Sequence, residues 1–297
     1  MNSINNLRNQ GFFTFNLGRL KLFIFSDGLS LIEPIQPSFA PNISEQEVQL
    51  FLNQKFLSSD NLTLAINILL ISVDEKLVLI DTGCGPNLGP TSGKLLERLL
   101  EAGINPNKIT DIVLTHAHPD HIGGILTSDD TLAFPNADIY LAENEYNYWT
   151  DENPDFSKGT DNDIAAFEIQ FAKHHLTLIK NRITLYDEKD TLFDFLKLDS
   201  APGHTPGHTI ITVFSEGEEL VHVADTFQHV LLIEHPEWGN QIDSDFLLSI
   251  RTRKKILEEL YRHRKLIFGN HLPYPGLGYI DKELGRFRYI SKSIYTV

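Results

Sequence analysis

The chain of 297 residues contains a single cysteine, Cys84, so no disulfide bond can form within it. Disulfide frameworks are typical of small secreted proteins, and nothing in this chain therefore requires an oxidising compartment. We interpret Cys84 as a small buried thiol rather than a reactive one. A Gly-x-Ser-x-Gly motif is missing as well, which argues against a serine hydrolase.

Long apolar runs are also missing. The longest, residues 62–72, is interrupted by Asn67 and is far shorter than the roughly 20 residues that span a bilayer. The first ten residues are polar, and the apolar stretch at 20–25 is too short for the core of a signal peptide. These features predict a soluble, cytoplasmic protein that does not act on membranes.

Basic residues are scarce, because 25 Lys and Arg stand against 40 Asp and Glu and give a formal net charge of −15. An acidic surface repels phosphate backbones and anionic lipids, so nucleic acid and membranes are poor partners. Two basic stretches, 251–255 and 262–265, fall on a helical pattern, and we interpret them as a solvated face. The charge favours a neutral substrate, or acidic groups that hold metal ions.

The pattern of apolar residues predicts an α/β fold in one domain. Strands or hairpins alternate with amphipathic helices in two similar halves, and neither a low-complexity linker nor a short repeat separates them. Expected strands lie at 20–25, 111–115, 138–141, 192–198 and 266–268, hairpins at 62–80 and 209–224, and helices at 44–56, 92–102, 142–149, 162–180 and 244–264. Two mixed sheets with outer helices would pack as a four-layer αββα sandwich. We expect residues 1–297 to form a single domain, with residues 1–60 as an N-terminal extension packing on it.

Histidine is abundant, and three of the 12 histidines lie in one loop directly after the predicted strand at 111–115. His116 and His118 are two residues apart, so both project the same way from an extended chain. Asp120 and His121 follow at once. Imidazole and carboxylate ligands suit zinc, and equally cobalt, nickel, manganese or iron. A polar loop with unrelated histidines is the alternative, but unpaired imidazoles at the end of a buried strand would be costly.

Three later segments place further donors at the ends of expected strands. Residues 201–208 form a tight turn with His204 and His208, Asp225 ends an apolar strand, and His271 follows a short strand. Each alone is more often a structural residue than a ligand. Together with the first loop they supply seven candidate ligands at strand ends, where α/β active sites usually lie.

The order H-x-H-x-D-H, then Gly-His, then Asp and a final His resembles the metallo-β-lactamase superfamily. Within it, residues 81–149, 203–208 and 271–280 are similar to the branch of methyl parathion hydrolase and the N-acyl-homoserine lactonases. Marks of this branch are the run at 132–136, Trp149 and the tail that begins His-Leu-Pro-Tyr-Pro-Gly. The resemblance extends over most of the chain from about residue 73 onward.

The resemblance implies two Zn²⁺ ions per subunit, for which other divalent metals could substitute. The roles it implies are His116, His118 and His204 on one ion, Asp120, His121 and His271 on the other, and Asp225 bridging both. It further implies that Asp81 accepts a hydrogen bond from a ligand imidazole, and that His208 is structural.

The resemblance also implies a mechanism. Two metals about 3.5–4 Å apart hold a bridging hydroxide near neutral pH, which attacks a carbonyl or phosphorus centre, and Asp120 passes a proton to the leaving group. Many N-acyl-homoserine lactonases carry a tyrosine three residues after the bridging aspartate, where this chain has Gln228. We predict that His229 supplies the missing hydrogen bond; a surface or helix histidine is the alternative. We predict that the Trp149 side chain forms part of the wall of the substrate pocket. The alternative is that it only packs in the protein core.

The leading hypothesis is a dinuclear-metal hydrolase that opens the lactone ring of N-acyl-homoserine lactones and so quenches quorum sensing. An apolar wall without a cationic cluster favours a small neutral acyl lactone or ester. An aryl phosphotriesterase is the main alternative, and a generic ester or thioester hydrolase comes next. A non-catalytic or redox member of the superfamily is disfavoured, because all seven ligands are present and no flavin domain fits. Relatives are commonly dimers, so the resemblance implies a homodimer.

Overall fold

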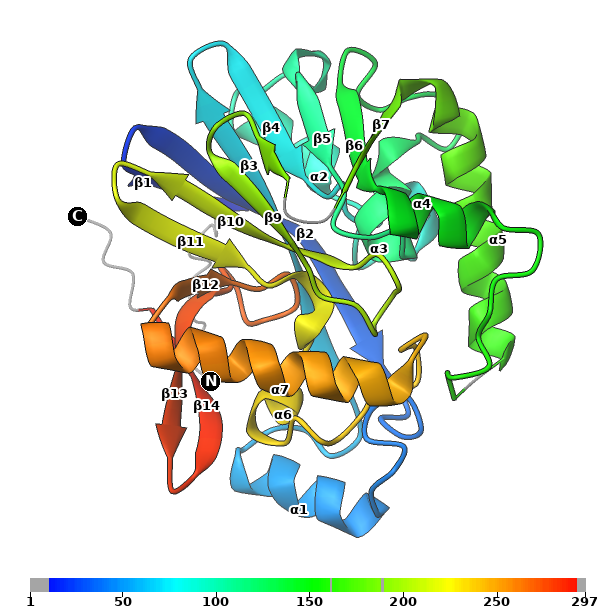
Figure 1. Ribbon diagram of the computed structural model, residues 1–297, viewed down its shortest axis with the longest axis vertical. Coiled ribbons are helices and arrows are strands. Elements are labelled where there is room, and N and C mark those ends of the chain that lie inside the picture. The colour runs from blue at the N-terminus through cyan, green and yellow to red at the C-terminus, as the bar shows by residue number, and fades with distance from the viewer. Residues whose placement is uncertain (1–10, 161, 188–189, 293–297) are drawn as a thin grey trace, which may run out of the picture.

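The computed structural model describes residues 11–160, 162–187 and 190–292, which fold into two seven-stranded sheets facing each other (Figure 1). The first sheet takes its strands in sequence order: β1 (Phe12–Leu17), β2 (Leu20–Ile32), β3 (Leu62–Val73), β4 (Lys76–Ile80), β5 (Asp111–Val113), β6 (Asp138–Ala142) and β7 (Ile183–Tyr186). The first four strands pair antiparallel, whereas β4 to β7 pair parallel.

The second sheet has the order β14-β13-β12-β11-β10-β9-β8. Its strands are β8 (Thr191–Leu192), β9 (Leu196–Ser200), β10 (Thr209–Ser215), β11 (Glu218–His222), β12 (Leu266–Phe268), β13 (Leu277–Glu283) and β14 (Arg286–Ser291). All neighbours pair antiparallel except β11 and β12, which run parallel. Each sheet is therefore mixed, as the sequence predicts.

Helices cover the outer face of each sheet (Figure 1). They are α1 (Glu45–Gln54), α2 (Leu95–Glu101), α3 (Pro119–Ile122), α4 (Glu143–Thr150), α5 (Asn162–Ile179), α6 (Val230–Glu234) and α7 (Phe246–His263). Apolar residues of α2 to α5 share one core with the first sheet, and those of α1, α6 and α7 share another with the second. A third core fills the space between the sheets. The four-layer αββα sandwich is therefore confirmed.

Local chemistry explains where the long helices begin. The Ser44 side chain accepts a hydrogen bond from the backbone N–H of Glu47, and the Glu47 carboxylate lies 3.2 Å from the Ser44 hydroxyl. Ser44 is thus the N-cap of α1, and its side chain satisfies one of the N–H groups that lack partners within a helix. The Asp245 side chain caps α7 in the same way, through the N–H of Leu248. The predicted starts of both helices differ from the observed ones by only one or two residues.

One predicted strand was wrong. Residues 192–198 form a tight hairpin in which β8 turns into β9. Phe193 and Asp194, at the turn, both have left-handed backbone conformations, with φ of 58° and 61°. Two consecutive residues with positive φ match the right-handed twist of the flanking strands. This turn could not be predicted from the residue types, because Phe is not a residue that favours positive φ.

The N-terminal segment contributes directly to the first sheet. Residues 12–32 form β1 and β2, and β2 lies between β1 and β3. Residues 45–54 form α1, which lies beside α6 (Figure 1) and shares an apolar core with α6 and α7. The first ten residues lie outside those that the structure describes. Among the described residues, no helix has the length and apolar character needed to cross a membrane.

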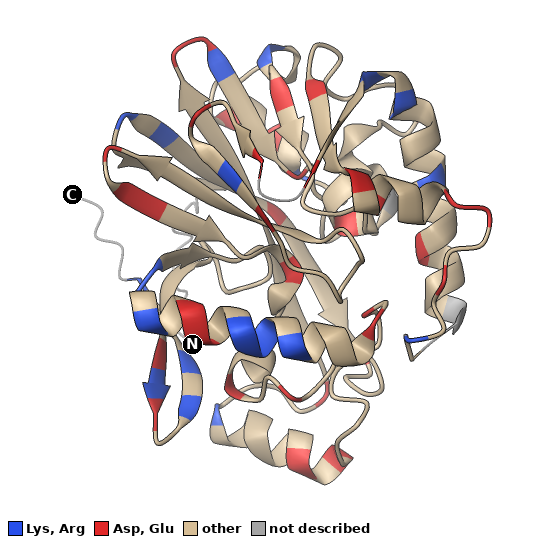
Figure 2. Ribbon diagram, viewed as in Figure 1, with Lys and Arg blue, Asp and Glu red and all other residues tan. Residues whose placement is uncertain are grey.

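Most basic side chains of α7 are exposed, and Figure 2 marks the positions of basic residues along this helix in blue. Arg253 is the exception to the predicted solvated face, since it is fully buried. Its guanidinium donates to the carbonyl oxygens of Thr226 and Trp238 and lies 3.4 Å from the Asp243 carboxylate. A buried cation needs such partners. Arg253 therefore joins α7 to the loop that follows β11.

Candidate metal centre

The first four candidate ligands lie where β5 ends and α3 begins. The backbone of His118 is extended, with φ −67° and ψ 156°, and Pro119 opens α3 directly after it. Proline suits the first position of a helix because its fixed φ matches that of the helix, and because an N–H at this position would have no partner within the helix. The chain therefore presents His116 and His118 from an extended segment, and α3 turns Asp120 and His121 back toward them.

Three histidines form the first candidate site. Ligand atoms of His116, His118 and His204 all lie within 4.8 Å of one another. Nδ1 of His118 is 3.1 Å from Nε2 of His116 and 2.9 Å from Nε2 of His204. Burial, together with the neighbouring imidazoles, holds the pKa of His116 and His118 well below the usual value. These rings are therefore neutral and offer lone pairs to a cation.

A second group, Asp120, His121 and His271, also has ligand atoms within 4.8 Å of one another. Nε2 of His271 lies 3.4 Å from the Asp120 carboxylate, and Nε2 of His121 lies 3.7 Å from it. Burial lowers the pKa of His121, but the carboxylates of Asp225, Asp120 and Asp81 outweigh it and hold this pKa well above the usual value. Negative charge is thus concentrated here, which favours a bound cation.

Asp225 lies between the two groups. Its Oδ1 is 3.1 Å from Nε2 of His121, while its Oδ2 is 3.2 Å from Nε2 of His271 and 3.5 Å from Nε2 of His204. Burial raises the pKa of Asp225, but the imidazoles of His271 and His121 outweigh it, so the carboxyl stays ionised. One carboxylate can therefore face both sites at once.

The donor set fits two divalent cations. Nε2 of His121 and Oδ1 of Asp225 are buried and have no hydrogen-bond partner, although they are only 3.1 Å apart. Leaving such atoms unpaired costs about 1–3 kcal/mol each, so a ligand normally satisfies them. Imidazole nitrogens with a few carboxylate oxygens are the ligands of catalytic zinc. The structure thus brings all seven predicted ligands together.

Most of these imidazoles form a second hydrogen bond through Nδ1. Oδ2 of Asp81 lies 2.8 Å from Nδ1 of His121, and Asp81 also accepts hydrogen bonds from the N–H and the hydroxyl of Thr115. The backbone carbonyl of Ala65 lies 2.8 Å from Nδ1 of His271. Such partners fix the orientation of a ring and raise its basicity as a ligand.

Sequence reasoning missed Asp243, whose Oδ1 lies 2.9 Å from Nδ1 of His204. Asp243 is fully buried and lies in the connection between α6 and α7. No local pattern marks it, because its role depends on how this connection folds over the turn that carries His204. The neighbouring Gln228, also buried, places its amide nitrogen 3.3 Å from the same Nδ1 atom.

Replacing Asp243 with asparagine should weaken metal binding at the three-histidine group. The change removes the charge that orients His204, and partners of this kind are worth roughly 10–100-fold in metal affinity. Zinc affinity from competition with a chromophoric chelator measures the effect. Asp138→Asn, an exposed change on β6, is the control and should leave affinity unaltered. Equal affinities in both variants would show that Asp243 does not support His204.

His208 has a structural position. Its Nδ1 bonds to the carbonyl of Ala201, and its Nε2 accepts a hydrogen bond from the N–H of Asp225. Burial lowers the pKa of His208 to about 3, so the ring is neutral and both of its nitrogens are used. The ring thereby fixes the backbone of Asp225.

Trp149 is fully buried in α4, with its ring edge-on to His118 at a centroid distance of 5.5 Å. Its indole N–H donates to the Glu145 carboxylate. This burial agrees with the packing alternative that the sequence left open, and the substrate-binding role stays a prediction. Cys84 is a buried free thiol, as predicted.

Glu168 is a second residue that sequence reasoning missed. It lies on the inner face of α5, nine-tenths buried, and its Oε2 has no hydrogen-bond partner. Burial, and secondarily the Asp120 carboxylate, raise the pKa of Glu168 from 4.5 to about 8. Helical periodicity alone predicts an apolar residue at this position, because Ala165 and Ala172 lie on the same buried stripe.

The contribution of Glu168 to the stability of the metal-free protein should therefore fall as pH rises from about 4.5 to about 8. In this range the folded state holds a proton on Glu168 that the unfolded state has lost, so the free energy of the folded state rises relative to that of the unfolded state as pH increases. Glu168→Gln should remove this contribution, a few kcal/mol. Urea unfolding at the two ends of the range measures it, with the exposed Glu152→Gln as control. An identical pH slope in Glu168→Gln would contradict the assignment.

Comparison with known proteins gives a consistent result. A family model described as "Metallo-beta-lactamase superfamily" matches residues 62–258. "Probable metallo-hydrolase YflN" of Bacillus subtilis (strain 168) is 27% identical over 161 residues, which is 52% of this chain and 56% of that protein. "N-acyl homoserine lactonase AiiB" of Agrobacterium fabrum (strain C58 / ATCC 33970) is 32% identical over 85 residues, or 23% of this chain and 31% of that protein. The chain thus matches 56% of the length of the first of these curated relatives and 31% of the second.

Similarity to solved structures extends over nearly the whole chain. "AidC, a Dizinc Quorum-Quenching Lactonase, in complex with a product N-hexnoyl-L-homoserine" has a TM-score of 0.92 and 37% identity, covering 96% of this chain and 99% of that chain. "Hydrolase AbOPH in beta lactamase superfamily" has a TM-score of 0.87 and 26% identity, with the same coverage. Both similarities cover more of the chain than residues 62–258, which the family model matches.

Proposed function

Because the chain belongs to the metallo-beta-lactamase superfamily, we propose that it opens the lactone ring of N-acyl-homoserine lactones at a dinuclear metal centre. The observation that carries the proposal is the convergence of seven His and Asp side chains on two adjoining groups. It is supported by the similarity to AidC, a dizinc lactonase whose structure holds N-hexanoyl-homoserine as product. By this activity the protein quenches quorum sensing.

The described residues would hold two Zn²⁺ ions. We assign one ion to His116, His118 and His204, the other to Asp120, His121 and His271, and Asp225 to both. When bound, the two ions would lower the pKa of water and polarise the carbonyl oxygen of the ester. The acidic residues around the centre offset the positive charge of the ions.

Asp120 is the most accessible of the assigned ligands. Its side chain is 27% exposed, whereas the side chains of His121, Asp225 and His271 are at most 4% exposed. A substrate that enters from solvent therefore meets this carboxylate first. We assign to Asp120 the transfer of a proton from the attacking water to the leaving alkoxide of the opened ring, which needs a carboxylate within hydrogen-bond reach of both oxygens.

His229 is neutral and is oriented as a donor. Burial lowers its pKa to about 4, and its Nδ1 accepts a hydrogen bond from the N–H of Leu231. The proton of the neutral ring therefore lies on Nε2. His229 lines a mainly apolar cavity of about 430 Å³ together with Leu62, Thr63 and Pro273. We propose that this Nε2–H donates to the substrate, in place of the tyrosine found in other lactonases.

The same cavity suits a neutral acyl chain. Pro273 lies two residues after His271, and Thr63 lies two residues before Ala65, whose carbonyl holds that ligand. Lys55, a basic residue that lines the cavity, forms an ion pair with Glu234. An apolar lining with its cation already paired favours a neutral acyl lactone over an anionic substrate.

A panel of N-acyl-homoserine lactones and an aryl phosphotriester, offered to the zinc-loaded protein, tests the proposal. We expect ring opening at a kcat/KM far above that for the phosphotriester, and a loss in the His229→Phe variant. Phosphotriester turnover that exceeds lactone turnover would favour the alternative activity. Equal lactone rates in wild type and His229→Phe would remove His229 from the mechanism.

A homodimer and a cytoplasmic location are further parts of the proposal. The dimer rests on the family resemblance alone, and light scattering at micromolar concentration tests it. The location rests on the single cysteine, since no disulfide within the chain requires an oxidising compartment. Fractionation of cells that produce the protein tests the location, and recovery of the protein outside the cytoplasm would contradict it.

A further inference from the structure

Glu145 of α4 carries an unusual number of hydrogen bonds for one buried side chain. Oε1 accepts from the backbone N–H of Ala117 at 2.9 Å and from the indole N–H of Trp149 at 2.6 Å. Oε2 accepts from the hydroxyl of Thr205 at 2.6 Å and from the backbone N–H of Gly207 at 2.9 Å. The residue is 0% exposed, so these four partners replace water completely.

All four partners of Glu145 are donors. Burial raises the pKa of this carboxyl, but a protonated carboxyl would turn its own O–H toward another donor. The ionised form only accepts, and it satisfies every partner with two hydrogen bonds at each oxygen. The side chain therefore works as a compact, charged clamp rather than as a proton donor.

The clamp joins the two segments that carry the three-histidine group. Ala117 lies between His116 and His118 in the connection from β5 to α3, whereas Thr205 follows His204 in the turn between β9 and β10. These segments extend from different sheets. Without a link across them, the distance of 2.9 Å between His118 and His204 would depend on how the sheets pack.

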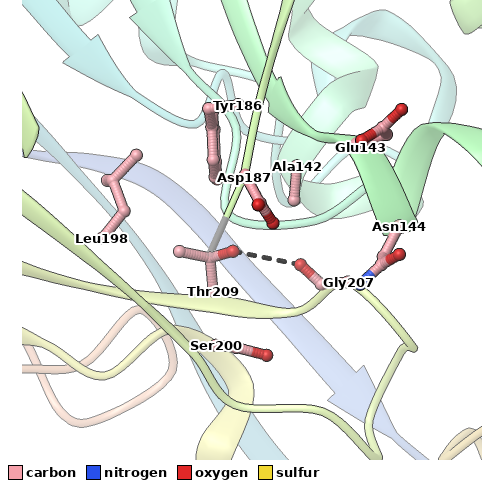
Figure 3. Close-up of a pocket in the computed structure, with 9 residues that line it drawn as sticks. All are labelled: Ala142, Glu143, Asn144, Tyr186, Asp187, Leu198, Ser200, Gly207 and Thr209. Carbon is pink, nitrogen blue, oxygen red and sulfur yellow. Dashed lines mark hydrogen bonds between the residues drawn. The ribbon is translucent and has the colours of Figure 1, made fainter. Parts of the chain in front are cut away.

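Gly207 lets the turn approach the clamp. A Cβ atom on this residue would lie 2.2 Å from the backbone nitrogen of Glu145, so only glycine fits between the turn and α4. Figure 3 shows the other side of the same residue, where the Thr209 hydroxyl donates to the carbonyl of Gly207 at 3.0 Å. The crevice beside it holds only about 10 Å³. The turn is therefore fixed on both sides, with no room for a ligand.

We propose that Glu145 is a positioning residue, whose carboxylate holds His118 and His204 at the spacing that one metal ion requires. The proposal rests on the proposed metal ligands. Its effect is local, because none of its four contacts reaches Asp120, His121 or His271. Glu145 should therefore set the affinity of one of the two metal positions and leave the other nearly unchanged.

The Glu145→Gln variant tests this, since the amide keeps the size of the side chain but replaces one acceptor oxygen with a donor. Titration of the metal-free protein with Co²⁺, followed by visible absorption, separates the two binding steps. We expect one step to weaken roughly 10–100-fold and the other to stay unchanged. Glu143→Gln, an exposed change two residues earlier on the same helix, should alter neither step. A role in folding alone would lower thermal stability without changing either affinity.

A double-mutant cycle assigns the weakened step. In a His118→Asn background, where the three-histidine position is already damaged, Glu145→Gln should have no further effect on the remaining step. If Glu145→Gln does not fold, the Trp149→Phe, Thr205→Val double variant removes two of the four donors and should weaken the same step. The proposal is overturned if either variant binds Co²⁺ at both positions with the affinities of the wild type. Failure of the wild type to bind two Co²⁺ ions would instead refute the proposed metal ligands.

Discussion

Replacing Asp225 with asparagine should abolish lactone turnover and weaken both metal positions at once. Its two carboxylate oxygens face His121 on one side and His204 and His271 on the other. A bound structural Zn²⁺ contributes about 10–16 kcal/mol over some four ligands, so one ligand is worth roughly 3 kcal/mol, or on the order of 100-fold in affinity. Loss at both ions should lower kcat/KM by more than about 10³-fold. Metal content by atomic spectroscopy and lactone kinetics measure the two effects.

The control for this change is Asp129→Asn, which alters an exposed carboxylate and should leave metal content and turnover as in the wild type. His118→Ala is a useful contrast, because His118 belongs to only one of the two groups. It should lower the metal content by one ion, whereas Asp225→Asn lowers it by more. If Asp225→Asn retained two ions and normal turnover, Asp225 would not be a ligand that both metal positions need.

The ligands could be predicted from the sequence because each lies beside a local signal. His116 and His118 follow a buried strand with the alternation of an extended chain, and Asp225 and His271 each follow an apolar strand. Strand ends of one layer meet at one edge, so residues that follow them converge. The fold class could be predicted for a related reason, since both halves of the chain show strands and helices in a similar order.

The residues that hold the ligands could not be predicted in this way. Three of the four partners of Glu145 lie 28 to 62 positions away in sequence, and the His204 ring that Asp243 contacts lies 39 positions away. The immediate neighbours of Glu145 and Asp243 form no recognisable motif. Arg253 is part of a basic run, but the turn of the helix buries this one position and exposes the rest. In each case the tertiary structure selects which polar residue becomes buried and paired. Sequence patterns describe local periodicity, and these contacts are not local.

Removal of the metal ions should abolish activity and lower thermal stability together. Without cations, buried atoms such as Nε2 of His121 and Oδ1 of Asp225 have no partner. Binding at about a thousandfold above Kd contributes about 4 kcal/mol per ion. For a chain of this size 1 kcal/mol moves Tm by about 2 °C, so the loss of two ions should lower Tm by on the order of 15 °C.

Adding different metal ions back to the metal-free protein tests which ion the site prefers. Zn²⁺ added to the chelator-treated protein should restore both Tm and turnover, because five of the seven assigned ligands are imidazoles and imidazole suits zinc. Mg²⁺ at the same concentration should restore neither, since it prefers oxygen ligands in octahedral geometry. Recovery with Mg²⁺ would mean that carboxylates alone form the centre. Activity that survives complete removal of metal would mean that the seven side chains serve another purpose, and the proposed lactonase chemistry would have to be abandoned with them.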